Sequence, residues 1–256
     1  MTIKVSIITV VYNADDTIEN CIKSIRSQTY PDIEHIIIDG GSTDSTTDII
    51  SRFKDGISVL VSEKDKGVYD AMNKGINLAK GEIIGFLNAD DVYAANDTVS
   101  ELVAFMRNGL FDAVYGDLAY IDRHDTDSVV RYWRAGKYRQ GAFFRGWAPP
   151  HPTFFCRRSV YEKYGCFNSN LQIAADFELM LRFIEKHQIK VGYLPQCIVK
   201  MRTGGKANVL KGILKGNLEI INSFRLNGLN ISPWFFILKP IDKISQLCNI
   251  RRVVKR

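Results

Sequence analysis

Apolar residues in the first third of the chain follow two kinds of pattern. Short runs rich in Val and Ile predict four buried β-strands, over Lys4–Val11, Ile33–Ile38, Ile57–Val61 and Glu82–Leu87. Between these runs, apolar positions recur every three to four residues and predict helices over Thr17–Gln28, Ser45–Phe53 and Tyr69–Ala79. Strands that alternate with helices build βαβ units, so we expect an α/β fold with a mostly parallel sheet.

The pattern changes after Asp91, where a hairpin or a mixed extension of the sheet is expected. Strand-like runs continue over Ala113–Ile121, Ser128–Tyr138 and Ile189–Met201. Helical spacing is found over Asp97–Arg107, Ile173–His187, Val209–Asn227 and Trp234–Leu247. An aromatic and glycine-rich loop is expected over Gln140–Pro150.

Each of the first four predicted strands ends in polar residues. These ends are Tyr12-Asn13, Asp39–Ser42, Ser62–Lys66 and Asn88–Asp91, and three of them carry acids. Parallel strands that alternate with helices bind ligands at their carboxyl ends. We therefore expect a polar ligand site where these four segments meet.

The net charge of +6 is concentrated at the C-terminus. Residues 206–256 hold ten Lys and Arg side chains against Glu219 and Asp242, a balance of +8. Either a solvated tail or an anionic partner accounts for such a segment. Aromatic and basic residues on short amphipathic helices suit an anionic membrane surface, so we favour peripheral membrane contact. We divide the chain into a main domain, residues 1–205, and this basic helical extension, residues 206–256.

Other features of the sequence bear on where the protein works. No apolar run approaches the roughly 20 residues that a membrane-spanning helix needs. Met1–Thr9 leads straight into a strand without a signal peptide. The five cysteines are scattered and form no CxxC pair, which favours reduced thiols over a disulfide framework or a zinc site. We expect a cytoplasmic protein, with any membrane contact peripheral and at the cytoplasmic face of the inner membrane.

Asn88-Ala89-Asp90-Asp91 follows a predicted strand, so its carboxylates should lie on the ligand side of the sheet. Carboxylate oxygens are hard ligands for Mg²⁺ or Mn²⁺, and Mg²⁺ is typically held by one or two carboxylates together with substrate phosphates. The same residue types also favour helix N-caps. The sequence pattern alone leaves the metal site and the cap open.

Two further acids are candidates for chemistry. Asp39 begins a glycine-containing loop, Asp39–Thr46, and its carboxylate could accept a hydrogen bond from the N–H of a pyrimidine ring. The loop has neither the G-x-G-x-x-G dinucleotide fingerprint nor a G-K-[ST] phosphate loop. Asp176 opens a predicted helix and could act as a general base on a substrate hydroxyl. Helix capping and the helix dipole are the alternative explanations for these acids.

Taken together, four stretches of the chain resemble family 2 glycosyltransferases of the bacterial surface-polysaccharide type. They are Val5–Thr46, Ser62–Asp91, Pro149–Asn168 and Ile173–Phe183, and they occur in the family's order at family-like spacing. The resemblance spans roughly the first 200 residues. It implies the GT-A fold, a Rossmann-like α/β domain, with the C-terminal helices as an extension.

The resemblance also implies roles for individual residues. Tyr12 matches the aromatic residue that stacks on the nucleotide base, and Asp39 matches the acid that contacts the base, usually uracil. Asp65 and Gly67 fall in the donor-pocket segment. Asp176 matches the catalytic base.

The metal-binding DxD motif of the family is matched with one departure. Asp90 corresponds to its final Asp, the expected ligand of Mn²⁺ or Mg²⁺, and Asp91 adjoins it as a second metal ligand. The first position is Asn88, a neutral amide that still donates and accepts hydrogen bonds at the donor. This departure leaves the coordination of the divalent ion open.

The implied reaction is an inverting transfer from a nucleotide sugar, expected to be UDP-linked, to a hydroxyl of a saccharide acceptor. A polyprenyl-diphosphate-linked acceptor would explain the expected membrane contact. One alternative is a sugar-1-phosphate nucleotidyltransferase, but the segment after the first strand is acidic rather than glycine-rich and basic. The other is a non-catalytic module that binds nucleotide or nucleic acid. No nucleic-acid-binding motif accompanies the basic tail, so we expect no nucleic-acid partner.

Overall fold

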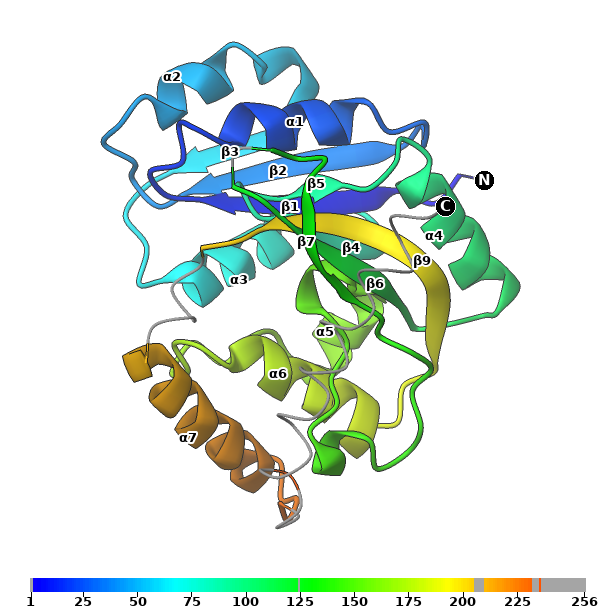
Figure 1. Ribbon diagram of the computed structural model, residues 1–256. Helices are drawn as coiled ribbons and strands as arrows, with labels where there is room; N and C mark the ends of the chain where they lie inside the picture. The colour runs from blue at the N-terminus through cyan, green and yellow to red at the C-terminus, as the bar shows by residue number, and fades with distance from the viewer. Residues whose placement is uncertain (1, 124, 205–209, 232–234, 236–256) are drawn as a thin grey trace.

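The computed structural model describes residues 2–123, 125–204, 210–231 and Phe235 (Figure 1). Its strands form one nine-stranded sheet in the order β3-β2-β1-β4-β8-β6-β9-β5, with β7 paired to β6. The strands are β1 Val5–Val11, β2 Ile33–Asp39, β3 Val59–Ser62, β4 Ile83–Phe86, β5 Val92–Tyr93, β6 Ala113–Ile121, β7 Val129–Trp133, β8 Phe155–Arg157 and β9 Val191–Arg202. The helices are α1 Ile18–Arg26, α2 Thr46–Ser51, α3 Val68–Leu78, α4 Thr98–Asn108, α5 Arg158–Tyr164, α6 Ala175–Met180 and α7 Leu210–Leu226. Short helical turns are η1 Lys54–Gly56, η2 Phe143–Arg145, η3 His151–Thr153 and η4 Leu181–Lys186.

The sheet is mixed rather than mostly parallel across its whole width. β3, β2, β1 and β4 are parallel neighbours, as predicted. β8 then lies antiparallel between β4 and β6, and β5 pairs antiparallel with β9. These two strands have three and two residues, too few to show a periodic pattern in the sequence.

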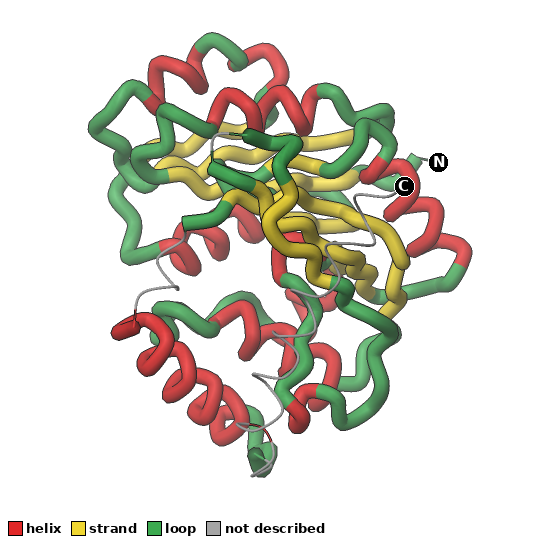
Figure 2. The backbone as a smooth tube through the Cα atoms, viewed as in Figure 1, coloured by secondary structure: helices red, strands yellow, loops and turns green. Residues whose placement is uncertain are grey.

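Buried side chains form a separate core on each face of the sheet. Within β1, Ile8 and Val10 point to the core that contains α3, α5 and α6, whereas Ile7 and Val11 point to the core under α1 and α4. This alternation follows from the two-residue period of a strand. Helices therefore cover both faces, as the backbone trace in Figure 2 shows.

Two predicted elements differ in extent from the structure. The predicted strand Ser128–Tyr138 ends at Trp133, and the following residues run as a loop to η2. The predicted helix Ile173–His187 is α6 followed directly by η4, a π-helical turn. In both cases the periodic pattern of apolar residues continues past the point where the strand or the α-helix ends.

The predicted C-terminal extension is described only in part. α7 matches the predicted helix Val209–Asn227 and packs against α6 (Figure 1). Ile220 and Phe224 of α7 belong to the same core as α3 and α6. The predicted helix Trp234–Leu247 lies outside the described residues apart from Phe235. Across the described ranges, no helix combines the length and hydropathy needed to cross a bilayer.

Candidate active site

The carboxyl ends of β1, β2, β3 and β4 lie at one edge of the sheet because these strands are parallel. Tyr12 follows β1, Asp39 ends β2, and Asp65 comes shortly after β3. The structure therefore brings together the polar strand ends that the sequence singled out. This is the edge where an α/β sheet of this kind binds ligands.

Tyr12, Gly40 and Asp65 meet at this edge. A Cβ atom added to Gly40 would lie 2.5 Å from Oδ2 of Asp65 and 3.5 Å from Cδ2 of Tyr12. The Tyr12 ring is 58% exposed although it is large and largely apolar. An exposed ring beside an acid, with a bare backbone at Gly40 between them, forms a platform for a flat polar ligand.

Asp39 is completely buried and organises this edge. Its carboxylate accepts hydrogen bonds from the Ser42 hydroxyl at 2.5 Å and the Ser62 hydroxyl at 2.6 Å, and from the Ser42 backbone N–H at 3.2 Å. Ser42 in turn accepts from the Asn13 N–H at 2.8 Å. The predicted contact of Asp39 with a base stays a prediction, since its oxygens are engaged by the two serines.

Gly67 links the Asp65 segment to α3. Its N–H donates to Oδ1 of Asp65 at 2.8 Å, and its φ of 124° is a conformation that side-chain-bearing residues rarely adopt. Nothing lies within 4 Å of the position that a Cβ would occupy. Gly67 thus leaves open space in front of the N-terminus of α3, where backbone N–H groups favour anions.

The loop after β4 carries the two predicted metal ligands, and their surroundings differ. Asp90 is partly exposed, whereas Asp91 is completely buried. Asp91 accepts from the Asn88 amide at 3.2 Å through Oδ2, and its Oδ1 has no hydrogen-bond partner. Burial raises the pKa of Asp90. Burial, with the charge of Asp90 added, raises the pKa of Asp91 well above its usual range.

These surroundings suit a cation near the loop. A bound divalent ion would lower the pKa of both carboxyl groups, because its charge offsets their burial and their mutual repulsion. Oδ1 of Asp91, which is buried and unpartnered, marks a place where a positive charge would be stabilising. Among the described residues, no group of three or more His, Cys, Asp and Glu side chains is arranged to hold a metal. Phosphate oxygens would have to complete the coordination of an ion held here by one or two carboxylates.

Arg202, at the end of β9, was not predicted as part of the site. It is buried and donates to the backbone carbonyl of Asp90 at 2.6 Å and to that of Arg123 at 3.0 Å. Arg123 also forms an ion pair with Asp16 at 2.7 Å. The acidic loop thus has a fixed counter-charge from a strand more than a hundred residues away, which no local sequence signal reveals.

Asp176 lies in the first turn of α6 and faces α3. Its Oδ1 accepts from the Tyr69 hydroxyl at 3.3 Å and from the Phe177 N–H at 2.8 Å. Tyr69 stands two residues after Gly67, so the predicted base and the predicted donor segment share one helix as their support. Asp176 remains partly exposed and therefore accessible to a substrate.

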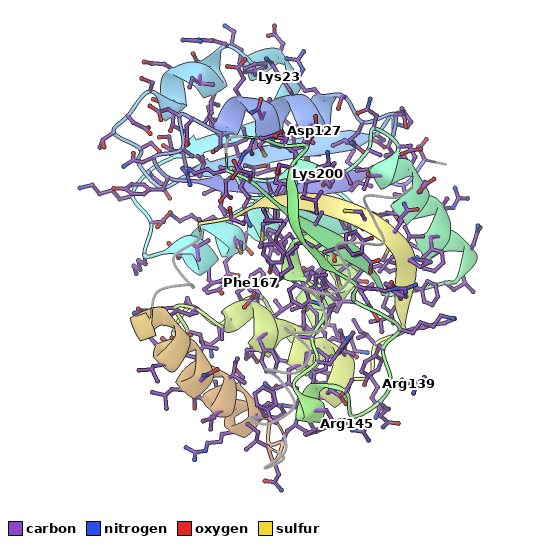
Figure 3. The ribbon with its side chains drawn as sticks, in the orientation of Figure 1. Lys23, Asp127, Arg139, Arg145, Phe167 and Lys200 are labelled. Atoms are coloured by element: carbon purple, nitrogen blue, oxygen red, sulfur yellow. The ribbon has the colours of Figure 1, made fainter. Side chains whose placement is uncertain are left out.

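His151 and Phe167 pack between these elements. The His151 ring lies 5.6 Å from the Phe86 ring and 5.7 Å from the Phe167 ring, and its Nε2 has no partner. Burial lowers the pKa of His151, and the nearby Asp176 charge opposes that shift. Phe167 stacks on Tyr69 at 5.5 Å (its position is labelled in Figure 3). These rings join β4, η3 and α3 around Asp176.

Comparison with known proteins identifies the family to which the chain belongs. A family model described as Glycosyl transferase family 2 matches residues 6–165. The "PGL/p-HBAD biosynthesis glycosyltransferase" of Mycobacterium bovis is 30% identical over 210 residues, which cover 80% of this chain and 79% of that protein. The "UDP-Glc:alpha-D-GlcNAc-diphosphoundecaprenol beta-1,3-glucosyltransferase WfaP" of Escherichia coli is 43% identical over 103 residues, 40% of this chain and 41% of that protein.

The fold is also similar to that of a solved structure. The mannosyltransferase PcManGT from Pyrobaculum calidifontis, in complex with GDP-Man and Mn²⁺, superimposes with a TM-score of 0.65 at 20% identity. The match covers 98% of this chain and 71% of that one. At this level of identity the comparison establishes the GT-A fold alone.

Proposed function

Because the chain belongs to glycosyl transferase family 2, we propose that it is an inverting enzyme that moves a sugar from a UDP-linked donor to a hydroxyl of a saccharide acceptor. One observation carries the proposal. Asp176 is held by Tyr69 of α3, the helix whose N-cap is Gly67, a residue of the expected donor segment. A carboxylate is thereby fixed beside the segment expected to hold the donor. The sugar-1-phosphate nucleotidyltransferase and the binding module have no comparable support.

The donor nucleotide would lie across the ends of β1, β2 and β3. Tyr12 offers an exposed ring on which a base can stack, and Asp65 offers an acceptor for the polar edge of the base or ribose. Asp39 would act at the base directly or through Ser42 and Ser62, which it holds in place. The sugar diphosphate would extend past Gly67 toward Asn88 and Asp90. A UDP-linked donor is supported by the E. coli relative, whose name specifies UDP-Glc.

A divalent ion, Mn²⁺ or Mg²⁺, would be held by Asp90, with Asp91 and Asn88 behind it. Such an ion would neutralise negative charge on the departing diphosphate. Asp90 is the more open of the two carboxylates, and Arg202 fixes its backbone. The Mn²⁺ in the P. calidifontis structure supports the choice of ion.

The chemical step is a single displacement. The Asp176 carboxylate takes the proton of the acceptor hydroxyl while that oxygen bonds to the anomeric carbon. The bond between the anomeric carbon and the diphosphate oxygen breaks on the opposite face, and UDP departs with the bonding electron pair. Tyr69 holds Oδ1 of Asp176, which leaves Oδ2 for the acceptor. No covalent intermediate with the protein is required.

We further propose that the acceptor is linked to a polyprenyl diphosphate and that the protein works at an anionic membrane surface in the assembly of a surface polysaccharide. The E. coli relative is named for a diphosphoundecaprenol-linked acceptor. Leu214, Leu218 and Leu226 of α7 are exposed, with Lys215 and Arg225 exposed on the same helix. Exposed leucines interspersed with cations on one helix fit the interface of an anionic bilayer.

A second basic segment supports the same surface. Lys137, Arg139 and Arg145 are exposed, and within the described part of the chain none of them has an acidic side chain at ion-pair distance. The ring of Phe144, next to Arg145, lies 5.5 Å from the ring of Phe224, so this segment lies against α7. Figure 3 labels Arg139 and Arg145 in the lower part of the view. Liposome flotation tests the proposal. Binding should require phosphatidylglycerol and weaken in Leu214→Ser/Leu218→Ser. Equal flotation with neutral lipid, or by the double variant, would contradict it.

The catalytic proposal is tested with Asp176→Asn. This change keeps the shape of the side chain and its bond with Tyr69 but removes the proton acceptor. UDP release from UDP-glucose with N-acetylglucosaminyl-diphosphoundecaprenol should fall by a factor of about 10² to 10⁴, the usual contribution of a general base. The melting temperature should stay close to that of the wild type. Near-normal turnover by a folded variant would refute the role of Asp176.

A further inference from the structure

A carboxylate from α7 holds the segment that leads into α6. Oε2 of Glu219 accepts the backbone N–H of Ile173 at 2.8 Å and that of Ala174 at 2.9 Å. Both carboxylate oxygens accept the N–H of Gln172 at 3.1 Å. Gln172 and Ile173 precede α6 and Ala174 is its N-cap residue, so these N–H groups lie outside the hydrogen bonding of the helix and need a partner elsewhere. A single side chain therefore satisfies three consecutive donors.

The segment held by Glu219 is the one that carries the proposed base. Asp176 lies two residues after Ala174. The Tyr69 hydroxyl, on the other side, donates to the carbonyl of Ile173 at 2.8 Å as well as to Asp176. Ile173 is thus fixed by both of its backbone groups, its N–H by α7 and its carbonyl by α3. The position of Asp176 is set between these two contacts.

α7 is itself anchored firmly enough to transmit this restraint. Phe224 is fully buried, and its ring lies 5.9 Å from that of Phe177 in α6. One turn further on, Asn227 donates to Glu178 of α6 at 2.9 Å, and Glu178 pairs with Arg182 at 3.0 Å. The backbone of Glu219 therefore cannot move independently of α6.

We propose that Glu219 is a positioning residue for the transfer reaction. It orders residues 172–174 so that the Asp176 carboxylate is held where it can take the acceptor proton. Without Glu219, the three backbone N–H groups of residues 172–174 would lose their shared acceptor, and Asp176 would sample positions outside hydrogen-bond reach of the acceptor hydroxyl. A misplacement of about 1 Å costs a reaction as much as 10²-fold in rate. This inference rests on the proposed role of Asp176.

Steady-state kinetics of Glu219→Ala and Glu219→Gln test the inference, with the same UDP-glucose assay. We expect kcat to fall about 100-fold in Glu219→Ala and about tenfold in Glu219→Gln, because the amide oxygen of Gln still accepts one or two of the N–H groups. KM for UDP-glucose should stay within about twofold, since Tyr12, Asp65 and Asp90 are untouched. The matched control is Glu162→Ala on α5, whose exposed carboxylate pairs with Arg158 and lies outside the proposed site.

Hydrogen–deuterium exchange supplies a readout that does not depend on turnover. The amides of residues 172–174 should exchange faster in Glu219→Ala than in the wild type, while α3 and β4 keep their protection. Unchanged protection of these amides, or an unchanged kcat in a folded variant, would overturn the inference. A fall in kcat matched by an equal rise in KM would also overturn it. Asp176→Asn, assayed in parallel, separates the two proposals. Full activity of Asp176→Asn refutes the role of Asp176 as general base. An inactive Asp176→Asn together with a fully active Glu219→Ala refutes only the positioning role of Glu219.

Discussion

Gly40→Ala tests whether Tyr12, Gly40 and Asp65 form the proposed platform for the donor nucleotide. The added Cβ would lie 2.5 Å from Oδ2 of Asp65, closer than nonbonded atoms approach, and at a tight 3.2 Å from its Cγ. Asp65 is the side chain that must move, because it is partly exposed while the backbone of Gly40 is tied to Val11 through its N–H at 2.9 Å. The shift would break the bond between Asp65 and the Gly67 N–H.

The size of the effect follows from what is lost. A hydrogen bond to a charged group contributes about 1.5–3 kcal/mol, and each ~1.4 kcal/mol is tenfold in affinity. If Asp65 holds the donor, the dissociation constant for UDP should rise about 10- to 100-fold. The folding stability should change little. The backbone of Gly40 is not in the left-handed region, so Ala can adopt it, and Ala also lowers the conformational entropy of the unfolded chain.

Isothermal titration with UDP in the presence of Mn²⁺ measures the dissociation constant. Thermal unfolding, run in parallel, checks that the variant is folded. Gly56→Ala is the matched control. It adds the same methyl group before β3, away from the strand ends, where the nearest atom is Nε of Arg26 at 3.0 Å. UDP binding should be unchanged in the control. Wild-type affinity in a folded Gly40→Ala would show that the nucleotide does not bind at this platform.

Three further outcomes are expected. Tyr12→Ala should weaken UDP binding about 10- to 100-fold by titration with an unchanged melting temperature, because stacking of a base on an aromatic ring contributes about 1–3 kcal/mol; retention of affinity would rule out stacking. Asp39→Asn should lower the melting temperature by about 4–8 °C, equivalent to about 2 kcal/mol of lost charged hydrogen bonds with Ser42 and Ser62; an unchanged value would contradict the described network. Because the raised pKa of Asp91 means that the folded state binds its proton more tightly than the unfolded state, metal-free protein should gain stability as the pH falls from neutral toward the ordinary pKa of Asp. The pH dependence of the melting temperature should be weaker in Asp91→Asn than in the wild type. Equal slopes of melting temperature against pH in the two proteins would refute the raised pKa of Asp91.

The sequence could predict the first half of the sheet because β1, β2 and β4 are buried on both faces. They are short runs rich in Val and Ile, and their predicted ends lie within one residue of the observed ends. The polar residues after them were predicted to meet because parallel strands end at one edge. β8 and α5 were missed, since Phe155–Arg157 is short and follows an irregular loop that only the tertiary structure organises.

The predicted site residues were the ones with local signals, and the missed ones have none. Asp39, Asp65 and Asp90 are acids at strand ends or shortly after them, which a topological argument finds. Glu219 and Arg202 act on backbone groups of Ala174 and Asp90, far from them in sequence. A lone acid on an amphipathic helix or a lone cation at a strand end looks like solvated surface until the packing of α7 on α6, or of β9 on the loop after β4, is known.

A thermal-shift panel of UDP-, GDP- and dTDP-linked sugars, with and without Mn²⁺, on wild type and Asp90→Ala tests the central claim most directly. We predict stabilisation of the wild type by the UDP-linked sugar in the presence of Mn²⁺, with the Mn²⁺-dependent part lost in Asp90→Ala. Absence of stabilisation by every nucleotide sugar, in well-folded protein with Mn²⁺ present, would contradict the account.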